Sequence, residues 1–166
     1  MLSSERLLIQ PTSEEDAVMM YELMNTPSWL EYIGDRNIRS VDDAKSYIRS
    51  NIISQYERLG YSSFTISLAL TNEKIGVCGL YDRESVDGID LGFALFPQFA
   101  GQGFAFEACR KLMEAARDKF SLEELSAITS ANNVKSKSLL KKLGFSIKKD
   151  IQSNGDSLEL WHIKLK

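Results

Sequence analysis

The chain carries, at residues 97–106, the stretch Pro97-Gln98-Phe99-Ala100-Gly101-Gln102-Gly103-Phe104-Ala105-Phe106. It joins an apolar, strand-like run to a long amphipathic helix pattern. A helix N-terminus presents unpaired backbone N–H groups and the positive end of the helix dipole. Because glycine lets an anion approach the backbone closely, this junction indicates an anion-binding site. By itself a Gly-x-Gly turn is equally compatible with a simple helix start.

The composition indicates one globular domain over residues 1–166, because 43% of its residues are hydrophobic and can form a sizeable core. A net charge of -3 and a pI near 5.3 argue against a nucleic-acid partner. The N-terminal residues contain no long apolar core, so no signal peptide is expected, and no run reaches the roughly 18 apolar residues of a membrane span. We therefore expect a cytoplasmic protein with no membrane partner. Cys78 and Cys109 have no metal-ligand spacing and are expected to be buried free thiols.

In the first third of the chain, a short strand is expected at residues 6–10, followed by a helix. Either Thr12 with Glu15 or Ser13 with Asp16 supplies its capping box, and Pro27 is expected to end it. Residues 28–39 are expected to be irregular or briefly helical. A second helix follows, capped by Ser40 with Asp43 and stopped by Gly60, with an apolar stripe of Ala44, Ile48, Ile52 and Tyr56.

The remainder alternates strands and helices. Three strands at residues 64–70, 75–81 and 89–96 are separated by tight turns and predict an antiparallel meander. A helix over residues 104–120 then leads to a strand at 125–129, which predicts a crossover with parallel outer strands. A short helix at 133–143 precedes two final strands at 145–151 and 158–165, around the turn Asn154-Gly155-Asp156. The fold class is mixed α/β (α+β).

Four segments, taken in order, carry a family resemblance. They are Glu5-Arg6-Leu7-Leu8-Ile9-Gln10-Pro11, Leu91-Gly92-Phe93-Ala94-Leu95-Phe96-Pro97, Gly101-Gln102-Gly103-Phe104-Ala105-Phe106-Glu107-Ala108 and Asn133-Val134-Lys135-Ser136-Lys137-Ser138-Leu139-Leu140-Lys141-Lys142-Leu143-Gly144-Phe145. Together they resemble the GNAT N-acetyltransferase family, and within it the Rim-type branch of ribosomal-protein N-terminal acetyltransferases. The resemblance implies one GNAT-like domain: a mostly antiparallel sheet of about seven strands, splayed at the cofactor site and flanked by about four helices.

The resemblance implies acetyl-CoA as cosubstrate and no metal. Its pyrophosphate would be cradled by the backbone of Ala100, Gly101, Gln102, Gly103, Phe104, Ala105 and Phe106. We assign Gly103 as the helix-entry glycine, which puts Ala100 where relatives often carry Gln or Arg. The pantetheine arm would pair with the strand backbone of Phe93, Ala94 and Leu95 as an added strand does, although these residues could equally form an ordinary core strand. Asn133 would contact the arm near its far end.

Acyl transfer to an amine needs a base for the amine proton and an acid for the leaving thiolate. By resemblance, Asp90 stands where many relatives carry a glutamate base, and its shorter side chain favours a water relay. A solvated or salt-bridged strand aspartate is the alternative. Ser136 is the matching hydroxyl, because the tyrosine position of other branches is Leu140 here, and by resemblance it would act as the acid or contact the cofactor only by a hydrogen bond to the sulfur. Equally, Asn133 could serve only as a helix N-cap. Glu31 and Asp35 are lesser candidates in the acceptor region.

The expected function is acetyl transfer from acetyl-CoA to a primary amine by direct attack in a ternary complex. The amine belongs to a protein N-terminus or a small molecule, and the protein is expected to be a monomer or homodimer. A catalytically inactive CoA-binding sensor or interaction module of the same fold is the alternative. A dinucleotide-binding enzyme is excluded, since the turn lacks Gly-x-Gly-x-x-Gly. His162 is expected to be structural, and the basic run Lys141-Lys142 is expected to be a solvated helix face.

Overall fold

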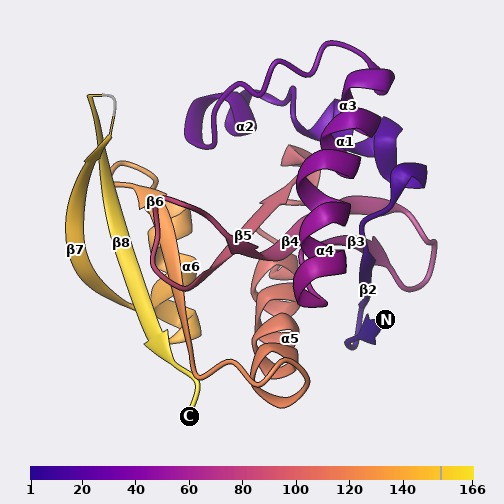
Figure 1. Cartoon of the computed structure of the whole chain (residues 1–166). Coiled ribbons are helices and arrows are strands. Elements are labelled where there is room, and N and C mark those ends of the chain that lie inside the picture. The colour runs from indigo at the N-terminus through magenta and orange to yellow at the C-terminus, as the bar shows by residue number, and fades with distance from the viewer. Residues whose placement is uncertain (154) are drawn as a thin grey trace.

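An eight-stranded mixed sheet organises the chain in the computed structural model, which describes residues 1–153 and 155–166 (Figure 1). The strands lie in the order β1-β2-β3-β4-β5-β6-β8-β7. Within the described residues, every neighbouring pair is antiparallel except β5 and β6. The strands are β1 (Leu2–Ser3), β2 (Leu7–Pro11), β3 (Ser63–Leu68), β4 (Lys74–Asp82), β5 (Ile89–Leu95), β6 (Glu124–Ser130), β7 (Ser146–Ser153) and β8 (Asp156–Lys164). The seven predicted strands are all present, and the two-residue β1 is added to them.

Helices cover both faces of this sheet. The α-helices of the described chain are α1 (Ala17–Leu23), α2 (Pro27–Tyr32), α3 (Val41–Tyr47), α4 (Ser54–Leu59), α5 (Phe104–Asp118) and α6 (Val134–Leu143). Two 3₁₀ turns, η1 (Glu14–Asp16) and η3 (Pro97–Phe99), and a π-helix, η2 (Ile48–Ile53), connect some of them. Helix α1 ends before Pro27, as expected, and Pro27 then begins the brief helix α2, because proline at the first helical position loses no hydrogen bond.

Most predicted helix boundaries are present. Of the two candidate capping boxes at the first helix, the structure forms the one in which the Ser13 amide donates to Asp16 Oδ2 at 2.9 Å. The Asp43 amide donates to Ser40 Oγ at 3.0 Å and caps α3 as expected. Gly60 and Gly144 close α4 and α6 in the left-handed conformation. The predicted turn at 154–156 includes Asn154, which lies outside the described residues.

Two hydrophobic clusters occupy opposite faces of the sheet. The larger contains the apolar side chains of α5 together with Leu140 and Leu143 of α6, and the second contains those of α1, α3 and η2. Alternation along β5 assigns its residues to these faces: Leu91, Phe93 and Leu95 face the larger cluster, while Ala94 faces the second. Asp90 therefore lies on the same face as α1 and α3, opposite Leu91, as the sequence predicted.

The sheet opens between β5 and β6. The antiparallel register of β4 and β5 continues over seven pairs, from Gly76 opposite Leu95 to Asp82 opposite Ile89. The parallel register of β5 and β6 contains one pair, Asp90 opposite Ser126. In Figure 1 the two strands diverge from each other, and α5 makes the predicted crossover between them. The splay expected for the cofactor site is thus present, and it begins at Asp90.

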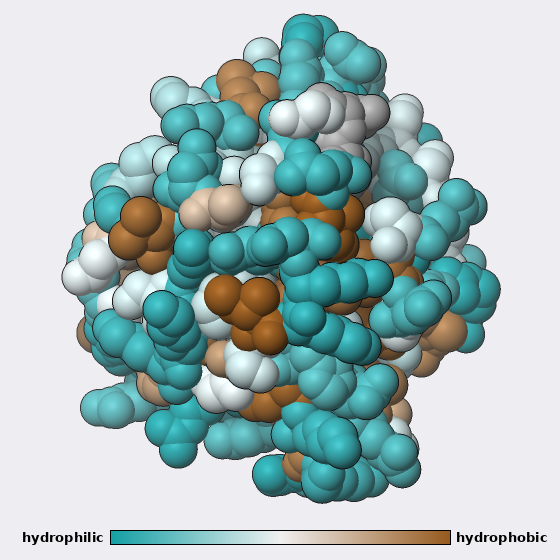
Figure 2. All heavy atoms as spheres, turned by 90° about the vertical axis from the view of Figure 1, so that its left-hand side faces the viewer, coloured by the Kyte–Doolittle hydropathy of each residue, from teal (hydrophilic) through white to brown (hydrophobic). Residues whose placement is uncertain are grey.

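The outer edge of the sheet is protected by charge. Strand β7 is the last in the order, and it exposes Lys148, Lys149 and Asp150. Figure 2, which views the molecule from the β7 side, shows a mostly hydrophilic surface with separate apolar patches. Charged side chains on an edge strand oppose pairing with a second sheet. The charged side chains of β7 therefore oppose edge-to-edge pairing with another sheet.

The π-helix η2 changes which residues of the second predicted helix are buried. Ala44, Ile48 and Ile52 of the predicted stripe are buried, but Tyr56 is 40% exposed, which corrects that prediction. A π turn contains more residues than an α turn, so the side chains after it are rotated relative to a 3.6-residue period. Gln55 occupies the buried place instead. Its amide donates to the carbonyls of Tyr61 (3.0 Å) and Leu80 (2.8 Å), and its Oε1 accepts from the Asp82 amide at 3.1 Å.

These three hydrogen bonds predict that Gln55→Leu lowers the free energy of unfolding by about 2–4 kcal/mol, since it strands buried backbone groups without removing volume. Denaturant unfolding followed by circular dichroism measures the change. Tyr56→Leu, at the neighbouring exposed position, is the matched control and is expected to stay within about 0.5 kcal/mol of the parent. Equal losses for the two variants would contradict the assignment of Gln55 as the buried residue.

Candidate active site

The glycine turn lies directly between β5 and α5. Gly101 and Gly103 both adopt left-handed φ angles, 76° and 82°, which disfavour other residues. Gly103 is the N-cap of α5, so the predicted helix entry is confirmed. The first helical bond runs from the Glu107 amide to the Gly103 carbonyl at 3.0 Å, and the amides of Phe104 to Phe106 precede it.

The turn itself adds further free donors. Among the described residues, the N–H groups of Gly101, Gln102 and Gly103 make no hydrogen bond, whereas the Ala100 amide donates to the Pro97 carbonyl at 3.2 Å. Gly101, Gln102 and Gly103 are all exposed. Successive free N–H groups at the start of a helix of 15 residues form a favourable environment for an anion. Ala100 offers no side-chain donor to this environment.

Strand β5 supplies one wall of the opening in the sheet. Phe93, Ala94 and Leu95 are half-buried and lie beyond Asp90, where β5 has no register with β6 in the described chain. Their side chains pack into the two clusters on either face. Their backbone is therefore paired with β4 on one side and unpaired on the side that faces β6.

Asp90 lies at the point where this opening begins. Its side chain is 3% exposed, and Arg83 Nε lies 3.2 Å from Oδ1, within the range of an ion pair. The arginine N–H is not directed at this oxygen, so Oδ1 has no hydrogen-bond partner among the described residues. Burial raises the pKa of Asp90 to about 6, while the positive charge of Arg83 opposes the shift. A carboxyl group with this pKa exchanges protons near neutral pH.

Tyr81 and Arg83 are part of this environment, although the sequence analysis did not single them out. Tyr81 pairs with Asp90 across the β4–β5 ladder, and the Arg83 guanidinium lies 5.2 Å from the centre of its ring. The ring covers two glycines that face each other: an added Cβ would lie 2.4 Å from it at Gly79 and 2.8 Å at Gly92. The sequence signal that could have revealed this arrangement is Tyr81 two residues after Gly79, with Gly92 on the neighbouring strand.

Asn133 and Ser136 lie on the other side of the opening, at the start of α6. Asn133 is the N-cap, and its Oδ1 accepts from the Ser136 amide at 3.2 Å. This contact confirms that Asn133 caps the helix, and it leaves the Asn133 NH₂ group for other contacts. The next residue, Lys137, donates to the Ala131 carbonyl at 3.2 Å and to Glu159 Oε2 at 3.4 Å. Glu159 is a further buried carboxylate that the sequence analysis did not identify.

Of the other residues considered from the sequence, Asp35 and His162 have charged partners, and both cysteines are buried. Glu31 is exposed on α2, and Asp35 forms an ion pair with Arg39 at 2.6 Å. His162 lies 3.2 Å from Glu124 on β6. Cys78 and Cys109 are buried free thiols, as predicted, and burial raises the pKa of both, that of Cys109 to about 12. Neither is therefore an activated nucleophile.

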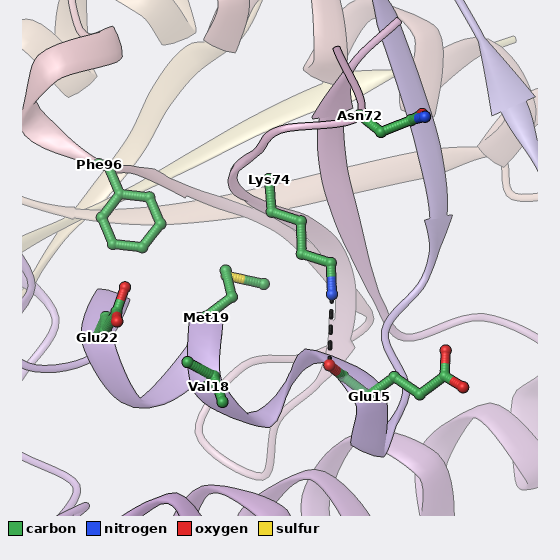
Figure 3. A pocket seen from close by; sticks show the side chains of 7 residues that line it. All are labelled: Glu15, Val18, Met19, Glu22, Asn72, Lys74 and Phe96. Atoms are coloured by element: carbon green, nitrogen blue, oxygen red, sulfur yellow. Dashed lines mark hydrogen bonds between the residues drawn. The ribbon is translucent and has the colours of Figure 1, made fainter.

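A cavity of about 410 Å³ lies elsewhere on the surface, between α1 and the start of β4 (Figure 3). Its lining residues are Glu15, Val18, Met19, Glu22, Asn72, Lys74 and Phe96. Lys74 is already bound there, to the Glu15 carbonyl at 3.3 Å and to Asp16 Oδ1 at 2.7 Å. None of the predicted site residues lines this cavity, so it is separate from the candidate active site.

The described residues contain neither a cluster of metal-ligating side chains nor a helix that could cross a membrane. No group of three or more His, Cys, Asp or Glu side chains is arranged to hold a metal ion in residues 1–153 and 155–166. Over the same residues, the helices are too short or too polar to cross a bilayer.

Comparison with known proteins identifies the family. The chain matches the acetyltransferase (GNAT) domain over residues 6–146, a range that includes β5, the glycine turn and the start of α6. It is 28% identical over 146 residues to the uncharacterized N-acetyltransferase p20 of Bacillus licheniformis, covering 87% of this chain and 81% of that protein. It is 25% identical over 145 residues to the uncharacterized N-acetyltransferase YoaA of Bacillus subtilis (strain 168), with the same coverage of 87% and 81%.

A solved structure of RimL, a ribosomal L7/L12 α-N-protein acetyltransferase in complex with coenzyme A, shares the fold. The TM-score is 0.84 at 19% identity, covering 97% of this chain and 95% of that one. The fold, the order of elements and the match over residues 6–146 agree with one another. The chain therefore belongs to the GNAT acetyltransferase family and is an acetyl-CoA-dependent N-acetyltransferase.

Proposed function

We propose that the protein transfers the acetyl group of acetyl-CoA to a primary amine of a protein N-terminus or a small molecule, by direct attack in a ternary complex. One observation carries this proposal: the buried carboxylate of Asp90, which lies beside Arg83, is found where β5 and β6 part, and the free amides of the glycine turn lie at the other end of β5. A donor bound along the opening would extend from an anion site to a base.

The residues present fit the donor. The free N–H groups of the turn and of the first turn of α5 would hold the pyrophosphate. The unpaired backbone edge of Phe93, Ala94 and Leu95 would accept the amide-containing pantetheine arm as an added strand. Asn133, whose NH₂ group is left free by its capping role, and Ser136 would contact the arm from α6.

The reaction needs little covalent chemistry from the protein. The amine nitrogen forms a bond to the thioester carbonyl carbon, the carbon–sulfur bond breaks, and the amine proton passes to Asp90 through a water molecule. The thiolate takes a proton from solvent, either directly or through the Ser136 hydroxyl, which regains its proton from water. Because Asp90 has a pKa of about 6, it is mostly ionised at neutral pH and can accept a proton. Direct attack agrees with the burial of both thiols, which leaves no cysteine to carry the acetyl group.

The class of acceptor is proposed from a structural relative, and a screen of amines tests it. RimL acts on the α-amine of ribosomal protein L7/L12, which favours a protein N-terminus as the acceptor here. The screen measures thiol release from acetyl-CoA with two panels: short peptides with free α-amines, and small amines such as polyamines and amino acids. We expect release with at least one peptide. Calorimetry shows independently whether acetyl-CoA binds. Binding without release over both panels would favour an inactive CoA-binding module.

Asp90→Asn is expected to lower kcat by about 100-fold, the lower end for loss of a general base. The rate of the parent should rise with pH through about 6, because only the ionised carboxylate accepts a proton, and this limb should be absent in the variant. The dissociation constant for acetyl-CoA should change by less than about twofold. Asp87→Asn, an exposed aspartate in the same hairpin, is the control. The same pH–rate profile in the parent and in Asp90→Asn would show that Asp90 is not the base.

Asn133→Ser separates capping from donor binding. Serine is as good an N-cap as asparagine, so the free energy of unfolding should change by less than about 1 kcal/mol. It lacks the NH₂ group, so the KM for acetyl-CoA should rise by about tenfold, the loss of one good hydrogen bond. Asn132→Ser, at the exposed neighbouring position, should leave the KM unchanged. An unchanged KM for Asn133→Ser would show that Asn133 caps the helix and does not contact acetyl-CoA.

A further inference from the structure

Residues near the N-terminus contact the glycine turn and the first turn of α5. Glu107, in the first turn of α5, accepts hydrogen bonds from Ser4 Oγ (2.7 Å), the Arg6 amide (2.8 Å) and Arg6 Nε (2.7 Å). Burial would raise the pKa of Glu107, but these three donors outweigh it and the pKa is lowered. The carboxylate is therefore fixed in its charged form against the segment that precedes β2.

The Arg6 guanidinium makes a second set of contacts, on the turn itself. Its Nη1 donates to the Gln102 carbonyl at 3.0 Å, and its centre lies 4.3 Å from the centre of the Phe104 ring. A Cβ added to Gly103 would lie 3.3 Å from Nη2. The planar guanidinium thus spans Glu107, the Gln102 carbonyl and the Phe104 ring, which a lysine could not do.

Peptide geometry gives this contact a consequence for the anion site. In a trans peptide, the C=O of one residue and the N–H of the next point in opposite directions. The described chain contains no cis peptide. Because Arg6 holds the Gln102 carbonyl toward itself, the Gly103 N–H is held away from Arg6. That N–H is one of the free donors of the turn.

We infer that Arg6 is a positioning residue for the donor's pyrophosphate: it holds the Gln102–Gly103 peptide in the orientation that presents the Gly103 N–H to the anion. This inference rests on the proposed function of the turn. Glycine at 101 and 103 leaves the turn conformationally permissive, so without an external contact the peptide is free to rotate. Glu107 in turn fixes the Arg6 side chain and neutralises its charge. Arg6 therefore acts by orienting the Gln102–Gly103 peptide and not by attracting the pyrophosphate charge.

The test compares two acetyl donors, acetyl-CoA and S-acetylpantetheine, which lacks the pyrophosphate. In Arg6→Met, which keeps most of the side-chain volume, kcat/KM for acetyl-CoA is expected to fall by about tenfold or more, mainly through KM. The value for S-acetylpantetheine is expected to stay within about twofold. Calorimetry with CoA should show the same loss of affinity. Arg6→Lys should restore only part of it, because the ammonium cannot bridge both acceptors.

Two controls keep the outcomes distinct. Arg58→Met removes another surface ion pair, that with Asp82, and should alter neither donor's kinetics. If Arg6→Met fails to fold, Glu107→Gln serves instead, because it weakens the fixation of Arg6 and should show the same donor-selective loss. An equal fall for both donors, or no fall, overturns the positioning role. A parent enzyme that uses both donors equally well overturns the pyrophosphate assignment itself, and the positioning role with it.

Discussion

The single parallel pair between Asp90 and Ser126 is the constraint on which the rest of the architecture depends. It joins the antiparallel half β1–β5 to the half β6–β8 in one sheet, and α5 packs beneath the junction. If the pairing continued along β5, the backbone of Phe93 to Leu95 would be satisfied by β6 and closed to a ligand. Because it stops after one pair, β5 keeps a free edge that leads to the start of α5.

The same junction buries a charge. Asp90 has a folded-state pKa of about 6 against an ordinary value of 3.8, which corresponds to a cost of about 3 kcal/mol for the ionised form. Because the folded-state pKa is raised, the contribution of Asp90 to the free energy of unfolding is complete below pH 3.8. This contribution is lost as the pH rises through about 6. At neutral pH the fold therefore carries a destabilising carboxylate, which Arg83 only partly offsets. Such a cost is typical of functional sites.

Much of the fold could be predicted because its signals are local. Alternation along residues 89–95 identified the face of Asp90, and the family resemblance of the glycine turn identified Gly103 as the entry to α5. The prediction was wrong at Tyr56, because a helical stripe assumes 3.6 residues per turn and η2 is a π-helix. The prediction at Pro27 is confirmed: α1 ends before the proline, and the brief helix expected in residues 28–39 is present as α2, which Pro27 begins.

The sequence by itself determined the order of elements, the glycine turn, the helix caps and the side of β5 that carries Asp90. These depend on backbone preferences and periodicities that act over a few residues. Only the tertiary structure decided which groups surround them: Arg83 and Tyr81 over Asp90, and Arg6 with Glu107 against Gln102. Arg6 and Glu107 are separated by 101 positions along the chain, and packing of β2 beside α5 brings them together. Local propensities cannot specify such contacts, because they form only when the sheet and α5 share one core.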